Sequence, residues 1–167
     1  MELEKQFSDL RNGDKDAFAA IYKALRIPVY TLMLRIVNNR ETAEELMQEL
    51  FMRLYTSPPD STVKNPVAWV YASARNLALD ALRKQRRSED ITLQCSVACD
   101  MTAEKLDIES AIAVLTQEQR VVLTLHLNAD LSFAEIARIT GATLSSVYRR
   151  YRSAIKALRK ELNGGHP

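Results

Sequence analysis

The sequence is poor in the residues that build catalytic, metal and phosphate sites, with two cysteines, two histidines and four glycines in 167 residues. Cys95 and Cys99 have C-x3-C spacing without a second pair or a nearby histidine, so free thiols are favoured over a metal site. The chain has no His-Glu-x-x-His motif and no glycine-rich phosphate loop. We therefore predict no cofactor and no metal, and an enzyme is the least favoured class.

Long apolar runs are also missing, since none approaches 18 residues, and the first ten residues, MELEKQFSDL, are polar and acidic. These features disfavour a signal peptide and a membrane span, and they favour a cytoplasmic protein without membrane insertion of its own. The formal net charge is only +2, but residues 1–87 carry +3, residues 88–110 carry −5 and residues 111–167 carry +4. Two basic segments flank an acidic one.

Helical periodicity and helix-start signals run through the chain, and nothing reads as a strand. In the first half we expect helices over residues 2–11, from Asp14 or Asp16 to Leu25, from Pro28 to Val37, from a Thr42/Glu45 capping box to about Tyr55, and from Pro66 to Arg87. We predict an all-α protein of two small helical domains. A domain over residues 1–87 and a four-helix domain over 107–167 are joined by a flexible acidic linker, 88–106.

The stretch Leu131–Leu162 predicts two helices joined by a tight turn. Ser132 and Glu135 form a capping box for the first, Gly141 ends it, and Thr143 can cap the second. The second helix has an apolar stripe of Leu144, Val147, Tyr151, Ile155, Leu158 and Leu162. Its opposite face carries Ser145, Arg149, Arg152 and Lys156, flanked by Ser146 and Tyr148. This pattern is typical of a helix-turn-helix that reads the DNA major groove, and the alternative is a helix pair with a solvated basic face.

Two further surfaces are predicted in the first half. Glu41, Glu44, Glu45, Gln48 and Glu49 form an acidic stripe that is either solvated or a docking surface. The helix from Pro66 ends in Arg83-Lys84-Gln85-Arg86-Arg87, which exceeds what a helix C-terminus needs and suits a phosphate backbone. Trp69 is either a core residue or an exposed aromatic that meets bases.

Three blocks in this order carry a family resemblance over roughly residues 10–162. They are residues 43–49 (AEELMQE) with Phe51, residues 68–83 (AWVYASARNLALDALR), and residues 131–137 (LSFAEIA) followed by Ser146, Val147, Arg149 and Ala154–Leu158. On these motifs the chain resembles an extracytoplasmic-function sigma factor, the compact two-domain type of the bacterial sigma-70 family.

The resemblance implies a transcription initiation factor that binds core RNA polymerase and promoter DNA. It assigns contact with the polymerase clamp helices to Glu44, Glu45, Gln48, Glu49 and Phe51. It assigns recognition and melting of the minus-ten element to Asn65, Trp69, Arg75, Asn76, Asp80, Arg83 and Lys84. It assigns the minus-thirty-five element to Thr143, Ser145, Ser146, Tyr148, Arg149, Arg152 and Lys156, with a polymerase flap contact in the same domain.

Such factors are generally held inactive by an anti-sigma protein, often membrane-anchored, and the resemblance implies such a partner here. The main rival is a stand-alone helix-turn-helix regulator that binds operator DNA without polymerase. That rival does not account for the acidic helix or for the Trp69-to-Arg87 helix in a separate domain. Binding to promoter DNA in the absence of polymerase discriminates the two.

Overall fold

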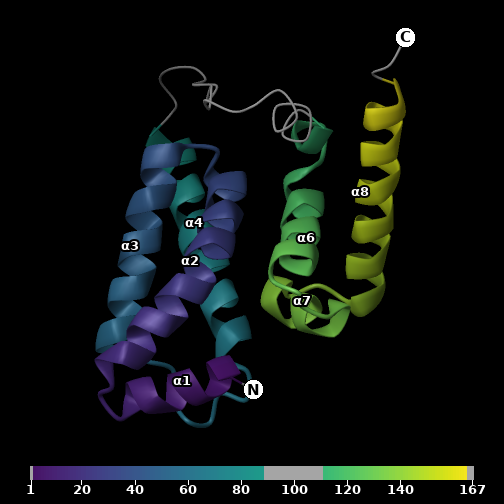
Figure 1. Ribbon diagram of the computed structural model, residues 1–167. Coiled ribbons are helices and arrows are strands. Elements are labelled where there is room, and N and C mark those ends of the chain that lie inside the picture. Colours follow the sequence, from purple (N-terminus) through teal and green to yellow (C-terminus); the bar gives the residue numbers. More distant parts are fainter. Residues whose placement is uncertain (1, 89–110, 165–167) are drawn as a thin grey trace. The chain divides into compact units, whose positions relative to one another are not determined.

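The computed structural model describes residues 2–88 and 111–164, which form helices joined by short turns and one loop (Figure 1). The helices are α1 (Glu2–Arg11), α2 (Lys15–Val37), α3 (Arg40–Thr56), α4 (Pro66–Ser88), α6 (Gln117–Asn128), α7 (Phe133–Thr140) and α8 (Leu144–Gly164). These ranges contain no strand, which confirms the all-α prediction, and the chain divides into two compact units. Residues 89–106 of the predicted linker, with Cys95 and Cys99, lie outside the described part.

The N-terminal domain is built around α2, which contacts α1, α3 and α4. In Figure 1, α2, α3 and α4 stand side by side, and α1 lies across one end of them. Ile21, Val29, Leu32 and Met33 of α2 are completely buried. They pack with buried residues of α3 (Ala43, Leu46, Leu50, Phe51, Leu54) and of α4 (Val70, Tyr71, Ala74, Ala78).

One predicted boundary in this domain is wrong, because α2 is a single helix with Pro28 inside it rather than two segments. Proline has no amide hydrogen and costs about 3 kcal/mol in a helix interior. Leu25 and Val29 are both buried on either side of Pro28, so one apolar stripe continues across it. Packing of that stripe offsets the local cost, which helix-start signals alone do not reveal.

A second predicted signal is also wrong, since α3 is capped by Asn39 and not by Thr42. The Asn39 side chain accepts a hydrogen bond from the Thr42 amide at 2.9 Å, so Thr42 is already inside the helix. Asn38 ends α2 with φ of 52°, in the left-handed region that asparagine tolerates. Two adjacent asparagines therefore end one helix and begin the next.

α2 is also long and apolar enough to cross a membrane by length and composition alone. In the fold it is the central helix of the domain, with eight buried residues from Ala17 to Val37. Its charged residues Lys23 and Arg26 are exposed on the side away from this core. The eight buried residues, packed against three helices, account for part of the apolar character of α2.

α1 is fastened to the rest of the domain at two points. Phe7 and Leu10 are buried. Arg11 Nη1 donates a hydrogen bond of 3.3 Å to the carbonyl oxygen of Pro59, in the loop between α3 and α4. Gly13, with φ of 88°, then allows the chain to turn into α2, which Asp14 caps. The first helix thus reaches a loop that lies 48 residues further along the chain.

The C-terminal domain packs α7 and α8 against α6. Thr116 and Gln119 form a capping box at the start of α6, the predicted Ser132/Glu135 box is confirmed, and Gly141 ends α7 with φ of 66°. Arg150 of α8 forms an ion pair of 2.7 Å with Glu118 at the start of α6. Of the fourth predicted helix, only its end from Ala111 lies in the described residues, where Ala111, Ile112 and Leu115 are buried.

The predicted apolar stripe of α8 holds only in the middle of the helix. Val147 and Ala154 are fully buried, while Leu144 and Leu162 are 55% and 53% exposed. Tyr151, Ile155 and Leu158 are half-buried against Leu115 and Leu123. Leu144 and Leu162, at the two ends of the predicted stripe, are therefore not part of the core.

Candidate nucleic-acid and protein interfaces

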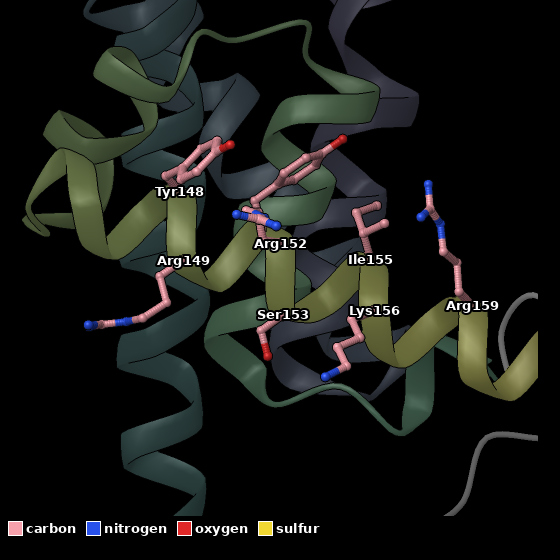
Figure 2. Close-up of a pocket in the computed structure, with 8 residues that line it drawn as sticks. Tyr148, Arg149, Arg152, Ser153, Ile155, Lys156 and Arg159 are labelled. Carbon is pink, nitrogen blue, oxygen red and sulfur yellow. The ribbon is translucent and has the colours of Figure 1, made fainter.

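The polar face of α8 is exposed as its periodicity predicts. Ser145, Arg149, Arg152 and Lys156 are all exposed, as is Thr143 just before the helix. Figure 2 shows Arg149 and Lys156 extending from one side of α8 and Tyr148 and Ile155 from the other. Six basic and no acidic residues lie between Arg149 and Lys160. This face offers hydrogen-bond donors and positive charge to a polyanion.

The start of α8 is organised by a small network of hydroxyl groups. Thr143 Oγ1 accepts from the Ser146 amide at 3.3 Å, as a cap does, and donates to Ser146 Oγ at 2.9 Å. Arg149 Nη2 lies 3.5 Å from the same Ser146 oxygen. The network places the hydroxyls of Thr143, Ser145 and Ser146 at the positive end of the helix, where phosphate oxygens bind readily.

Tyr148 is 50% exposed and lies beside Arg152. The Arg152 guanidinium carbon is 5.9 Å from the centroid of the Tyr148 ring, within the range of a cation–π contact. The other edge of Tyr148 meets Phe133 of α7, with ring centroids 5.8 Å apart. Arg152 and Tyr148 are therefore presented together on the solvent side of α8.

A groove of about 460 Å³ lies between the end of α3 and α4. Its α4 wall contains Trp69, Ser73, Asn76, Leu77 and Asp80, and its α3 wall contains Leu50, Arg53, Thr56 and Ser57. Trp69 is half-buried, so it is neither a fully covered core residue nor a fully exposed aromatic, the two alternatives that the sequence left open. A half-covered indole beside amide, hydroxyl and carboxylate groups suits an unstacked base, which needs one stacking surface and polar edges.

Three of the seven residues predicted for the minus-ten element, Trp69, Asn76 and Asp80, line this groove, and the other four do not. Asn65 caps α4, with its Oδ1 accepting from the Ala68 amide at 2.8 Å. Arg83 donates to Asp80 at 2.9 Å, and Lys84 is exposed one residue further on. Arg75 Nη1 lies 3.5 Å from Asn76 Oδ1. The three basic residues of the prediction, Arg75, Arg83 and Lys84, are therefore not part of the groove lining.

Hydrogen bonds from α1 and within the loop itself fix the loop before α4. Arg11 binds the Pro59 carbonyl, and Asp60 accepts hydrogen bonds from the Thr62 amide at 2.9 Å and from the Ser61 hydroxyl at 3.3 Å. The hydrogen bond from the Thr62 amide, with that from Ser61, lowers the pKa of Asp60, and the nearby Arg11 charge acts in the same direction. The loop thus enters α4 in a defined turn beside Ser57 of the groove.

A second groove, of about 330 Å³, lies between α2 and α3. Arg40, Glu44, Met47 and Gln48 of α3 line it together with Arg26, Ile27 and Tyr30 of α2. Ile27 is 62% exposed, an unusual position for a large aliphatic side chain in the middle of a core helix. Glu44 is already paired with Arg40 at 3.0 Å, and Glu49 with Arg53. The acidic stripe is therefore partly neutralised within α3.

One predicted partner-contact residue needs correction, because Phe51 is only 3% exposed. Its ring packs edge-on against Tyr22 at 4.8 Å and Phe18 at 6.5 Å between ring centroids, so other side chains cover it. Glu44, Glu45, Gln48 and Glu49 are all exposed. Phe51 supports the face on which these four residues lie and does not form part of its surface.

Sequence reasoning missed the partners from across each groove: Arg26, Ile27 and Tyr30 beside Gln48, and Arg53, Thr56 and Ser57 beside Trp69. Ile27 carried a usable signal, since it falls outside the buried stripe of α2 and yet is strongly apolar. The α3 residues carried none, because their place opposite Trp69 depends on how α3 and α4 pack.

Comparison with known proteins covers both domains. The family described as Sigma-70 region 2 matches residues 21–88, and the family described as Sigma-70, region 4 matches residues 105–158. The chain belongs to the sigma-70 family. Region 2 therefore contains both grooves, and region 4 contains α6, α7 and α8.

Relatives of similar length agree with this assignment. The chain is 28% identical to the ECF RNA polymerase sigma factor SigW of Bacillus subtilis (strain 168), covering 97% of both chains. It is 27% identical to the ECF RNA polymerase sigma factor SigK of Mycobacterium ulcerans (strain Agy99), covering 97% of this chain and 94% of the other. The protein is an alternative sigma factor of the extracytoplasmic-function group, which directs transcription.

A solved structure shows the same fold. The sigma factor RpoE from Bartonella quintana, crystallised in complex with the anti-sigma factor NepR, superposes with a TM-score of 0.74 at 20% identity. The match covers 92% of this chain and 100% of that one.

Proposed function

We propose that this sigma factor binds core RNA polymerase through the groove between α2 and α3. Gln48 and Glu44 line it with Ile27 and Tyr30, so polar and apolar contacts are available within a few ångströms of each other. A helical partner could place an apolar side chain over Ile27 while its charged groups meet the exposed carboxylates Glu45 and Glu49. The clamp helices of the polymerase are the proposed occupant.

The groove between α3 and α4 is the proposed site for an unpaired base of the minus-ten element. The main support is that Trp69, Asn76 and Asp80, three of the residues predicted for the minus-ten element, line one groove of about 460 Å³. Stacking on an aromatic ring contributes about 1–3 kcal/mol per base, which offsets much of the cost of unpairing it. Arg83 and Lys84, exposed further along α4, would meet the phosphates that follow.

The exposed face of α8 is the proposed reader of the minus-thirty-five element. Thr143, Ser145 and Ser146 would contact phosphate at the helix start, and Arg149, Arg152 and Lys156 would lie along the major groove. A bidentate arginine–guanine contact is worth about 1–3 kcal/mol of discrimination. Tyr148 adds an apolar edge beside Arg152. The same domain would contact the polymerase flap.

The factor would act in the cytoplasm by binding rather than by catalysis, with promoter DNA and polymerase as its partners. RpoE from Bartonella quintana is held by an anti-sigma factor in its crystal structure. By analogy, we propose that an anti-sigma protein, membrane-anchored or soluble, regulates this chain.

The deciding experiment is run-off transcription with core polymerase and this protein on a library of promoters. We expect transcripts that require both proteins, and DNA binding that is weak until core polymerase is added. Strong, specific binding by the protein alone, with no polymerase-dependent transcript, would favour the stand-alone regulator.

Two variants separate the proposed surfaces. Asn76→Ala should lower opening of a fully duplex promoter but leave a promoter with a pre-unpaired minus-ten element nearly unaffected. Arg149→Ala should reduce discrimination between promoters that differ in the minus-thirty-five element, about 10-fold for one base-reading contact. Both variants should bind core polymerase normally. A loss of core binding in either one would show that the surfaces are misassigned.

A further inference from the structure

His126 belongs to none of the surfaces described above, yet it contacts both helices of the helix-turn-helix. It is half-buried near the end of α6, and its Nδ1 lies 2.9 Å from the carbonyl oxygen of Leu131. Because a carbonyl oxygen only accepts hydrogen bonds, Nδ1 carries the hydrogen and donates it. This bond fixes the orientation of the imidazole ring.

The bond spans the turn from α6 to α7. Asp130 in this turn has φ of 50°, in the left-handed region, and the Leu131 amide donates back to the Leu125 carbonyl at 3.3 Å. Ser132, the next residue, caps α7. The hydrogen bond from His126 therefore connects the end of α6 to Leu131, the residue directly before the cap of α7.

The imidazole ring also joins the aromatic residues of the other two helices. Its centroid is 4.6 Å from that of Phe133 in α7 and 5.0 Å from that of Tyr151 in α8. Phe133 in turn meets Tyr151 at 5.1 Å and Tyr148 at 5.8 Å. We call His126, Phe133, Tyr148 and Tyr151 the aromatic cluster.

The aromatic cluster ends beside Arg152, one of the predicted DNA contacts, whose guanidinium carbon lies 5.9 Å from the centre of the Tyr148 ring. The cluster borders the aliphatic core, because Tyr151 packs against Leu115 and Leu123. The core residues Val122, Leu125, Ile136 and Val147 are at most 1% exposed. The aromatic residues are instead half-buried or exposed. Their arrangement runs from the turn between α6 and α7 out to the surface of α8.

We propose that His126 is a positioning residue for promoter reading. Its hydrogen bond and ring contacts hold Phe133 and Tyr151, and Phe133 holds Tyr148, so that Arg152 is presented to DNA in one orientation. An arginine side chain that rotates freely about its bonds loses conformational entropy when it binds. A preformed contact with an aromatic ring reduces that loss. The inference rests on the proposed function, in which Arg152 contacts the minus-thirty-five element.

Three substitutions separate the two parts of the His126 contact. His126→Phe keeps an aromatic ring but loses the Nδ1 donor, His126→Asn keeps a donor at a similar place but loses the ring, and His126→Ala loses both. Leu127→Ala is the matched control, since this neighbouring side chain is 61% exposed and lies outside the aromatic cluster.

Each variant is assayed as holoenzyme, with core polymerase, on two promoters that differ only in the minus-thirty-five element. The measured quantity is the ratio of initial transcription rates from the two. We expect His126→Ala to lower this ratio about 10-fold, within the range of one base-reading contact. His126→Phe and His126→Asn should fall between His126→Ala and the unmodified protein, and Leu127→Ala should leave the ratio unchanged. An unchanged ratio in all three His126 variants would overturn the proposal.

A double-mutant cycle tests whether His126 acts through Arg152. If it does, adding His126→Ala to Arg152→Ala should change the ratio by less than about twofold, because coupled residues are not additive. If the double variant instead lowers the ratio by the product of the two single-variant reductions, the proposal is wrong. Should His126→Ala prove unfolded by circular dichroism, the same cycle is read with His126→Phe and His126→Asn.

The results also distinguish this inference from the proposed function. If Arg152→Ala alone leaves the ratio unchanged, the assignment of α8 to the minus-thirty-five element fails at Arg152 and the role of His126 fails with it. If Arg152→Ala lowers the ratio and no His126 variant does, only the role of His126 fails. Nitrogen-15 NMR of the imidazole gives a separate readout, in which hydrogen on Nε2 rather than Nδ1 would contradict the bond to Leu131.

Discussion

The two domains present their binding groups in different ways. In the C-terminal domain the predicted DNA contacts lie along the exposed face of one helix, α8, together with the residue that precedes it. In the N-terminal domain the two candidate sites are grooves, one between α2 and α3 and one between α3 and α4, and each needs side chains from two helices. A helix face depends on its own helix being formed, whereas a groove depends on how two helices pack.

This difference predicts a different sensitivity to distant substitutions. A change in the core of the N-terminal domain that shifts α3 would disturb both grooves, because α3 forms a wall of each. A comparable shift of α8 would move its polar face as a unit, without changing the spacing of Arg149, Arg152 and Lys156 along it. The following four predictions test this contrast, from the largest expected effect to the smallest.

Core truncations should destabilise the two domains separately. Leu32→Ala in α2 and Ile136→Ala in α7 each remove a fully buried side chain, at a cost of about 2–5 kcal/mol. Trp69 is the only tryptophan, so its fluorescence reports on the N-terminal domain. Urea unfolding should show a lower Trp69 midpoint in Leu32→Ala only, while Ile136→Ala lowers helicity by circular dichroism at urea concentrations that leave Trp69 unchanged. Equal Trp69 shifts in both would mean that the domains unfold together.

Alkaline pH should weaken the N-terminal domain through Tyr71, whose pKa burial raises to about 12. Between pH 10 and 12 the unfolded chain releases the phenol proton and the folded chain keeps it, so stability falls as pH rises. The loss should reach roughly 2 kcal/mol by pH 11.5, at 1.36 kcal/mol per pKa unit. Urea midpoints of Trp69 fluorescence measure it. Tyr71→Phe should lack this part of the decline, and an identical decline in that variant would exclude Tyr71 as its source.

A carboxylate in the groove between α2 and α3 should weaken polymerase binding without unfolding the domain. Ile27→Asp adds charge at an exposed position, where stability changes are typically within 0.5 kcal/mol. We expect core affinity to fall about 10-fold or more, equivalent to about 1.4 kcal/mol. Titration of labelled protein with core polymerase measures it, with Ala19→Asp on the exposed part of α2 outside the groove as the control. Equal losses in the two variants would argue against a localised site.

Sequence reasoning predicted the helix-face site more completely than the groove sites, because the features of the helix face are set by residues close together in the sequence. The Ser132/Glu135 box, the Gly141 end and the Thr143 cap are local, so residue types at short spacing determine them. Each was confirmed. Trp69, Asn76 and Asp80 share a groove wall because spacings of seven and four residues place them on one face of α4. Their opposite wall, with Arg53 and Ser57, follows from packing alone.

The errors in the predicted elements have the same origin. Pro28 has the local signature of a helix start, and only the buried stripe on both sides of it shows why α2 continues. Phe51 belongs to a sequence motif that includes surface residues, yet its burial depends on Phe18 and Tyr22 of another helix. His126 bonds to the Leu131 carbonyl near the end of α6, and its ring contacts could not be derived from the sequence without the positions of α7 and α8.

The smallest expected effect concerns the ion pairs along α3. Arg40 and Glu44 are 66% and 49% exposed, so Arg40→Ala should change the free energy of unfolding by no more than about 0.5 kcal/mol. Thermal unfolding followed by Trp69 fluorescence checks this. A loss above 1 kcal/mol would show that the groove between α2 and α3 depends on this pair for its structure.

The bond from Arg11 to Pro59 shows that the family match and the folding unit have different limits. The Sigma-70 region 2 match begins at residue 21, yet α1 supplies two buried side chains, Phe7 and Leu10, and the donor that holds the loop before α4. Burial of such side chains contributes about 1.5–3 kcal/mol each. A shortened chain that begins at the family match would therefore expose an apolar surface on α2 and α4. For expression or evolutionary comparison, α1 should be kept as part of this domain.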